Sequence, residues 1–329
     1  MNRCLCCGKP IPENASERER AEGWHTACIR KFFGVNDLPE LDISEDALIR
    51  IAAENTNRGF TIPGVQKKMS LHLSSDKGTP RLTIVDYPTG YILKPQTQEF
   101  PNLPEAEYLV MRMAEKTGIS TVPFALIHMA GKTESMAYIT KRIDRIFPKK
   151  RSAKVERLAM EDFCQLEGHL TENKYLGSYE RCAKVISRYS ARAGLDLSEL
   201  FLRVVFSFAI GNSDMHLKNF SMIETDAASG EYILSKAYDL LPVNLVVPED
   251  NDEMALTLNG KKRNLRRTDF LKFASASGIA QEAAMKMIRH VVSMKPVYLD
   301  LCGESYLPDE MKERYSALIE ERSAILGQE

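Results

Sequence analysis

Apolar and polar positions alternate through the first half of the chain. Met69, Leu71 and Leu73 are separated by single polar residues. A period of two is typical of strands that are buried on one face. The pattern predicts strands over residues 59–98, 122–129 and 136–141.

Helical spacing of apolar residues begins after Pro104, and Gly118 follows the end of the expected helix. A shorter helix is expected over residues 44–54, with Ser44 as its cap. Beyond residue 155 helical patterns dominate. The expected ranges there are 198–211, 268–275 with Thr268 as the cap, 280–293 and 308–325.

A strand-rich half followed by a helical half predicts an α+β fold with two lobes. Protein kinases have this plan, with a strand-rich N-lobe and a helical C-lobe, but many other α+β proteins share it. We expect a small N-terminal segment over residues 1–34, a first lobe over 35–138 and a second lobe over 139–329.

Composition narrows the class of protein. The chain has 329 residues, of which 44% are hydrophobic and 27% charged, as in ordinary globular proteins. Its 44 basic and 45 acidic residues leave no overall positive field, which argues against direct nucleic-acid binding. The N-terminus is polar and residues 204–210 are the longest apolar run, so we expect a cytoplasmic protein without a signal peptide or membrane span.

Cysteine and histidine pairs near the N-terminus have the spacing of metal ligands. Cys4 and Cys7 form one pair, His25 and Cys28 form another, and seventeen residues separate the pairs. Two such pairs predict a closed, structural zinc knuckle. Cys6 could replace either neighbour, and free thiols in a reducing compartment are the alternative.

Three polar residues in the second half fit the requirements of phosphoryl transfer. Asp214 and Asn219 stand five residues apart, and Asp239 follows about twenty residues later. Kinases use one Asp as the base, and an Asn with a second Asp as Mg²⁺ ligands. Taken alone, Asp and Asn are common in turns and caps, so this spacing is weak evidence.

A lysine at a strand end adds to the pattern. Lys94 ends the apolar stretch from Tyr91, and Glu107 lies on the following helix. Kinases pair a strand lysine with a helix glutamate beside the ATP phosphates. A lysine that extends to solvent and a solvated glutamate are the alternative.

Taken in order, these elements resemble the HipA-like serine/threonine kinases over residues 60–275. The matching motifs are a G-x-Q-x-K loop (Gly64, Gln66, Lys68), the strand lysine Lys94, the helix glutamate Glu107, R-x-D-R at 142–145, E-D-x-C-Q at 161–165, the G-N-x-D-x-H-x-K-N-x-S loop at 211–221 and Y-D at 238–239. Ala106 replaces an asparagine of the family pattern.

The resemblance implies a role for each site residue. Asp214 would be the base, Asn219 and Asp239 would bind Mg²⁺, and His216 and Lys218 would support the loop or the phosphates. The nucleotide would be bound by Gly64, Gln66, Lys68, Lys94 with its partner Glu107, Thr140 and Lys141.

The resemblance is strongest to short, HipT-type family members, whose extra subdomain is a separate small protein. Those members often carry two serines in the loop, and Thr61 and Pro63 stand there in this chain. Thr61 is therefore the candidate for autophosphorylation.

The resemblance implies the toxin of a bacterial toxin–antitoxin system. It would phosphorylate a translation component such as an aminoacyl-tRNA synthetase, with a helix-turn-helix antitoxin and a small HipS-like subdomain protein as partners. A pseudokinase that only binds nucleotide or a DNA-binding partner is the alternative. The basic stretches 147–154 and 261–267 fit either solvated surface or a docking region.

Overall fold

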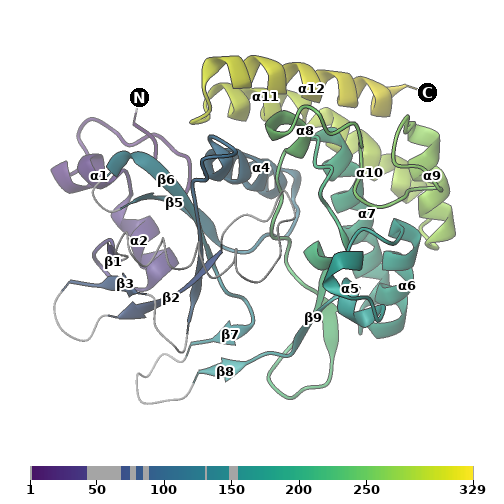
Figure 1. The fold of residues 1–329 in the computed structure, drawn as a ribbon, viewed down its shortest axis with the longest axis horizontal. Helices are drawn as coiled ribbons and strands as arrows, with labels where there is room; N and C mark the ends of the chain where they lie inside the picture. Colours follow the sequence, from purple (N-terminus) through teal and green to yellow (C-terminus); the bar gives the residue numbers. More distant parts are fainter. Residues whose placement is uncertain are drawn as a thin grey trace. The chain divides into compact units, whose positions relative to one another are not determined.

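The structure is a computed structural model that describes residues 2–42, 68–74, 79–83, 89–129, 132–147 and 155–328. The chain divides into two compact units, one of residues 1–108 and 122–143, the other of residues 109–121 and 144–329. Figure 1 labels the helices and strands of both units. The helix expected over residues 44–54 lies outside the described residues.

The first unit is built on a sheet. Among its described residues, six strands pair in the order β1-β3-β2-β4-β6-β5, all antiparallel except β1 with β3. The strands are β1 (Glu40–Asp42), β2 (Met69–Ser74), β3 (Arg81–Thr83), β4 (Tyr91–Pro95), β5 (Phe124–Met129) and β6 (Lys132–Lys141). Met69 and Leu71 are buried and Ser70 is exposed, which confirms the alternation at the start of β2.

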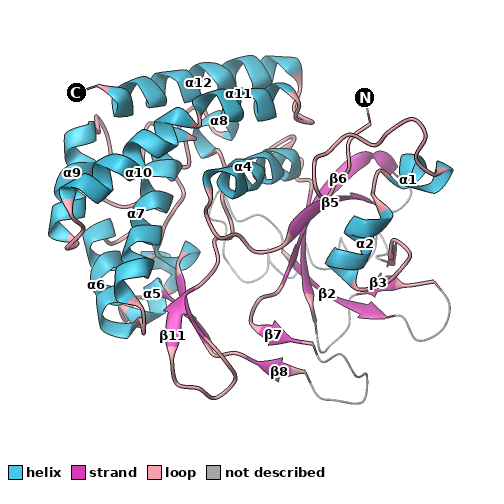
Figure 2. Cartoon of the chain, turned by 180° about the vertical axis from the view of Figure 1, so that it is seen from behind, coloured by secondary structure: helices cyan, strands magenta, loops and turns pink. Residues whose placement is uncertain are grey.

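Two short helices, α1 (Glu17–Glu22) and α2 (Thr26–Phe33), lie beside this sheet in the first unit (Figure 2). The rings of Trp24, Phe32 and Phe33 cluster, and Tyr91 of β4 packs against the two phenylalanines. The N-terminal segment therefore shares an aromatic cluster with the sheet.

The second unit is mainly helical. The long helix α7 (Ala193–Ala209) is largely buried and contacts α6, α10 and α12. The other helices are α5 (Phe163–Leu166), α6 (Tyr179–Tyr189), α8 (Val243–Val246), α9 (Arg267–Ala276), α10 (Gln281–Ser293), α11 (Lys295–Gly303) and α12 (Asp309–Gly327). Helix α4 (Leu103–Thr117), where the sequence places it, has residues in both units.

Small strands also occur in the second unit. Strands β9 (Met160–Asp162), β10 (Ser221–Glu224) and β11 (Tyr232–Leu234) form an antiparallel sheet in the order β11-β10-β9. Strands β7 (Arg145–Ile146) and β8 (Glu156–Arg157) pair with each other. No helix among the residues the structure describes has the length and apolar character needed to cross a bilayer.

Two expected helix starts are wrong. Helix α9 begins at Arg267, and Asp269 instead of Thr268 caps it by accepting a hydrogen bond from the Arg266 N–H at 2.9 Å. Helix α7 begins at Ala193, five residues before the expected start at Ser198. Gly194 lies in its first turn, and because glycine is a poor helix former, the sequence pattern does not predict a helix there.

The turn after α7 gives a test of packing. Gly211 has φ +69°, and a Cβ there would lie 2.6 Å from Cδ2 of Leu318. Gly278 has φ +73° with nothing within 4 Å of such a Cβ. Both Ala substitutions should cost about 1–2 kcal/mol for the left-handed backbone, and Gly211→Ala about 1 kcal/mol more for overpacking. Denaturant unfolding of the two variants measures this difference, and equal losses would contradict the packing argument.

Candidate functional site

The loop of residues 210–220 connects α7 to β10 in the second unit and is nearly all buried. The positive φ of Gly211 turns the chain out of α7, and the Asn244 N–H donates to the Gly211 carbonyl at 3.0 Å. The Tyr179 hydroxyl donates to the Met215 carbonyl at 3.0 Å. Buried irregular backbone needs such partners, so the loop has a defined shape.

Asp214 and Asn219, expected to act together, are in direct contact. The Asp214 carbonyl accepts hydrogen bonds from the His216 N–H at 2.8 Å and from Nδ2 of Asn219 at 2.9 Å. The Asp214 N–H donates to Oδ1 of Asn212 at 3.2 Å. The backbone of Asp214 is therefore held on both sides by side chains and amides of its own loop.

Asp239 is held close to the loop through its neighbour. The Tyr238 hydroxyl donates to the Lys218 carbonyl at 3.1 Å and lies 2.6 Å from the Ser221 hydroxyl. Burial, as the main cause, raises the pKa of Tyr238, so its hydroxyl keeps its proton. Asp239 itself has φ +60°, a left-handed conformation that is uncommon outside glycine and often marks functional positions.

Lys218 is anchored in the second unit. Its Nζ lies 2.7 Å from Oδ2 of Asp162 at the end of β9. Oδ1 of Asp162 also accepts the Gln165 N–H at 2.9 Å, which caps α5. The E-D-x-C-Q stretch therefore supplies the carboxylate that fixes Lys218.

Sequence reasoning missed Tyr175, which contacts the expected base. Its hydroxyl donates to Oδ1 of Asp214 at 2.6 Å, and its ring meets that of His216 edge-on at 5.1 Å. His216 is buried, with its Nε2 4.0 Å from Oδ2 of Asp214. Tyr175 lies in an irregular stretch without periodicity, and no spacing signal in the sequence identifies it.

In the first unit, Lys94 and Glu107 form the ion pair expected from the sequence. Lys94 Nζ and Glu107 Oε1 are 2.5 Å apart, and the side chains are 4% and 1% exposed. The Lys94 ammonium also lies 5.3 Å from the centre of the Tyr138 ring. A fully desolvated pair of this kind fixes the lysine in one position.

Three other residues expected at the nucleotide, Lys68, Thr140 and Lys141, lie in the described part of the first unit. The Thr140 hydroxyl donates to the Pro123 carbonyl at 2.9 Å, and burial lowers the pKa of Lys141. Lys68 is exposed immediately before β2. Gly64, Gln66 and Thr61 lie outside the described residues.

The four expected zinc ligands converge. The ligand atoms of Cys4, Cys7, His25 and Cys28 all lie within 4.8 Å of one another. Sulfur atoms around a tetrahedral zinc ion stand about 3.8 Å apart for Zn–S bonds of about 2.3 Å, so the arrangement has the correct size for a metal ion. Cys6 is not one of these four residues, although its thiol interacts with that of Cys28.

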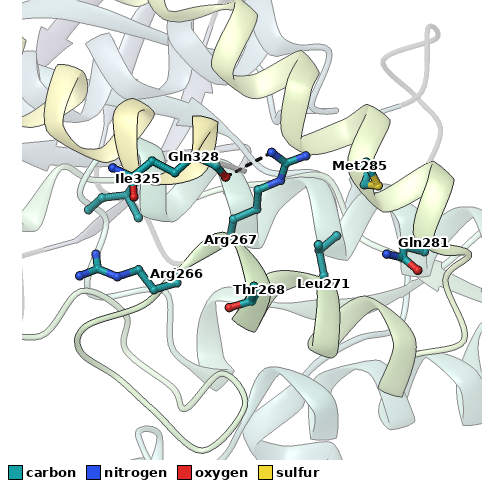
Figure 3. Close-up of a pocket in the computed structure, with 8 residues that line it drawn as sticks. All are labelled: Arg266, Arg267, Thr268, Leu271, Gln281, Met285, Ile325 and Gln328. Carbon is teal, nitrogen blue, oxygen red and sulfur yellow. Dashed lines mark hydrogen bonds between the residues drawn. The ribbon is translucent and has the colours of Figure 1, made fainter.

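A pocket of about 460 Å³ lies elsewhere in the second unit, among α9, α10 and α12 (Figure 3). Its lining contains Arg266, Arg267, Thr268, Leu271, Gln281, Met285, Ile325 and Gln328. Arg267 donates to the Gln328 carbonyl at 3.3 Å. None of the residues expected in the site lines this pocket, so it is separate from the Asp214 loop.

Comparison with known proteins gives matches over most of the chain. The family model described as HipA-like C-terminal domain matches residues 60–297. A Haemophilus influenzae protein named "Putative kinase" is 26% identical over 328 residues, covering 94% of this chain and 92% of that protein. The Sinorhizobium fredii protein "Putative kinase Y4dM" is 30% identical over 270 residues, 78% of this chain and 62% of that protein.

Two solved structures have a similar fold. A chain of the Shewanella oneidensis MR-1 toxin–antitoxin complex of HipA, HipB and operator DNA matches with a TM-score of 0.66 and 17% identity, covering 80% of this chain and 64% of that one. The Helicobacter pylori proinflammatory kinase CtkA matches with a TM-score of 0.53 and 15% identity, covering 78% and 93%. The chain thus spans under two thirds of the Shewanella chain and of the Sinorhizobium relative.

The buried pair of Lys94 and Glu107 can be tested without any assay of activity. Glu107→Leu leaves a buried ammonium without its carboxylate and should lower the free energy of unfolding by about 3–5 kcal/mol. Lys94→Met combined with Glu107→Leu should recover most of that loss. Denaturant unfolding measures both.

The exposed pair of Lys286 and Glu282 provides the control for this test. Glu282→Ala should change stability by under about 1 kcal/mol, since exposed pairs contribute little. A Glu107→Leu protein as stable as wild type would show that the buried pair does not contribute to stability, and a double variant no more stable than Glu107→Leu would show that the unpaired ammonium does not cause the loss.

Proposed function

The chain belongs to the family of the HipA-like C-terminal domain, and we propose that it is an ATP- and Mg²⁺-dependent protein kinase acting on serine or threonine hydroxyls. The observation that carries the proposal is the loop of residues 210–220. In it the Asn219 amide donates to the Asp214 carbonyl, and Tyr238, next to Asp239, donates to the Lys218 carbonyl. The relatives named as kinases support the same activity. A pseudokinase that only binds nucleotide or a partner is the second candidate, and the four residues Asp214, Asn219, Asp239 and Lys94 argue against it.

In the proposed reaction, Asp214 accepts the proton of the acceptor hydroxyl. The hydroxyl oxygen forms a bond to the γ-phosphorus of ATP, the bond from that phosphorus to the bridging oxygen breaks, and ADP leaves with the electron pair. A carboxylate within hydrogen-bond reach of the hydroxyl is the requirement for such a base. Asp214 is partly exposed on a rigid loop, which suits that role.

Asn219 and Asp239 fit the requirements of a Mg²⁺ site. The amide nitrogen of Asn219 is used by the Asp214 carbonyl, so its oxygen is the atom available to a cation. Asp239 adds a carboxylate, and oxygen ligands are those Mg²⁺ prefers. A bound Mg²⁺ would neutralise charge on the β- and γ-phosphates.

For the nucleotide, we assign Lys94 to the ATP phosphates and Thr140 and Lys141 to the strand that meets the adenine. The pairing with Glu107 supports this role, because kinases hold their phosphate-binding lysine in the same way. Gly64, Gln66 and Lys68 would complete the phosphate-binding loop. Autophosphorylation at Thr61 stays a prediction.

The biological role proposed is that of a toxin in a bacterial toxin–antitoxin system of the cytoplasm. The similar Shewanella structure is a complex of HipA, HipB and operator DNA, which supports this context. A helix-turn-helix antitoxin and a small HipS-like subdomain protein would be the partners. The acceptor would be a translation component such as an aminoacyl-tRNA synthetase.

At the N-terminus, we assign a structural zinc ion to Cys4, Cys7, His25 and Cys28. The convergence of the four ligand atoms supports the assignment. Four protein ligands leave no open position, so the metal would stabilise and not catalyse. The hydrogen bond with Cys28, followed by burial, raises the pKa of the Cys4 thiol to about 12.

The catalytic assignment predicts the effect of Asp214→Asn. Asparagine keeps an oxygen for the Tyr175 hydroxyl, so the fold should persist while phosphotransfer falls by about 10²–10⁴-fold. Phosphoproteomics of cells expressing wild type or Asp214→Asn should reveal an acceptor modified only by the wild type.

Asp239→Asn should lose activity similarly, and Asp300→Asn, on the exposed face of α11, is the control. Full transfer by both site variants would exclude this mechanism.

The zinc assignment predicts about one zinc per chain in wild-type protein and in Cys6→Ser. Cys7→Ser and Cys28→Ser should lose the metal and unfold at lower temperature, because metal binding contributes to folding. Acid should release the metal, since protonated thiols do not bind zinc. Elemental analysis and thermal unfolding measure this, and metal-free wild-type protein after growth in zinc would refute the site.

A further inference from the structure

Tyr175 is the described side chain whose hydroxyl reaches the Asp214 carboxylate from outside the loop of residues 210–220. It lies between a short 3-10 helix, Thr171–Asn173, and α6 in the second unit. Its hydroxyl donates to Oδ1 of Asp214 at 2.6 Å, a short, charge-assisted hydrogen bond. Tyr175 as a whole is 38% exposed, so part of the residue is accessible to solvent.

Tyr175 is held in place from several directions. Its ring packs edge-on against buried His216, with the centroids 5.1 Å apart. The Lys174 carbonyl accepts the Leu217 N–H at 3.2 Å, which joins the backbone beside Tyr175 to the loop. The Lys174 ammonium lies 4.9 Å from the centre of the Tyr175 ring. Tyr175 is therefore a fixed part of the site.

The backbone contacts of Asp214 do not by themselves fix its carboxylate. The terminal torsion of an aspartate is broad, so the carboxylate can rotate while the backbone stays in place. A hydrogen bond to one oxygen selects a single rotation and thereby sets the direction of the other oxygen.

We propose that Tyr175 is a positioning residue that holds the Asp214 carboxylate in the rotation required to accept the proton of the acceptor hydroxyl. The inference rests on the proposed kinase function. Burial first, and the nearby Asp214 second, raise the pKa of the Tyr175 phenol, so the hydroxyl keeps its proton at neutral pH. The ring contact with His216 and the backbone bond between Lys174 and Leu217 hold Tyr175 beside Asp214, as a positioning role requires.

Tyr175→Phe tests the proposal, because it removes the hydroxyl and keeps the ring on His216. With Mg-ATP and the acceptor found through the Asp214 comparison, kcat should fall about 10- to 100-fold, the range for losing a hydrogen bond to a charged group. The KM values for ATP and acceptor should stay unchanged. Tyr189→Phe removes a hydroxyl from the α6 tyrosine whose ring contacts Arg188, and it should change neither constant.

Two kinetic results for Tyr175→Phe would overturn the inference. An unchanged kcat would show that the hydroxyl does not matter, and a lower KM for the acceptor would show that Tyr175 occupies the position of the acceptor hydroxyl. A wild-type protein that transfers no phosphate to any protein would instead refute the proposed function.

A second measurement does not depend on activity. The ¹³Cζ resonance of Tyr175, assigned through Tyr175→Phe, should shift between wild type and Asp214→Ala, because the phenol loses its acceptor. A resonance that does not move would refute the hydrogen bond itself.

Discussion

The candidate site depends on one constraint, the need of buried irregular backbone for hydrogen-bond partners. In the loop of residues 210–220, side chains supply hydrogen bonds to backbone carbonyls, as a neighbouring strand does in a sheet. Asn219 binds the Asp214 carbonyl, Tyr179 binds the Met215 carbonyl and Tyr238 binds the Lys218 carbonyl. Among the residues that give the loop its shape are therefore Asn219, which contacts Asp214 directly, and Tyr238, the neighbour of Asp239.

Much of the fold follows from local patterns. The alternation at Met69 and Leu71 predicts a strand that the structure contains. Pro104 and Gly118 predict the two ends of α4 to within one residue. The predicted start of α9 is wrong because the carboxylate of Asp269, inside the first turn, accepts the Arg266 N–H. The neighbouring Thr268 does not cap the helix. The small sheet of β9, β10 and β11 pairs segments some sixty residues apart, and no short-range pattern encodes such a pairing.

The site was predictable to the extent that its residues lie in ordered motifs. The spacing of Asp214 and Asn219 and the cysteine pairs indicated contacts that the structure contains. The pairing of Lys94 with Glu107 also needed the expected strand and helix to pack. Tyr175 could not be found, because its position depends on a loop with no periodicity folding against a distant one.

The N-terminal segment has a further consequence for the sheet beside it. Strand β5 is the last strand of its sheet, and its Leu126 N–H donates to the Leu5 carbonyl at 2.9 Å. Leu5 belongs to the turn that carries Cys4 and Cys7. An uncovered strand edge invites pairing with another chain. The cysteine turn therefore covers part of this edge, and its removal would expose backbone groups of β5 that can pair with another chain.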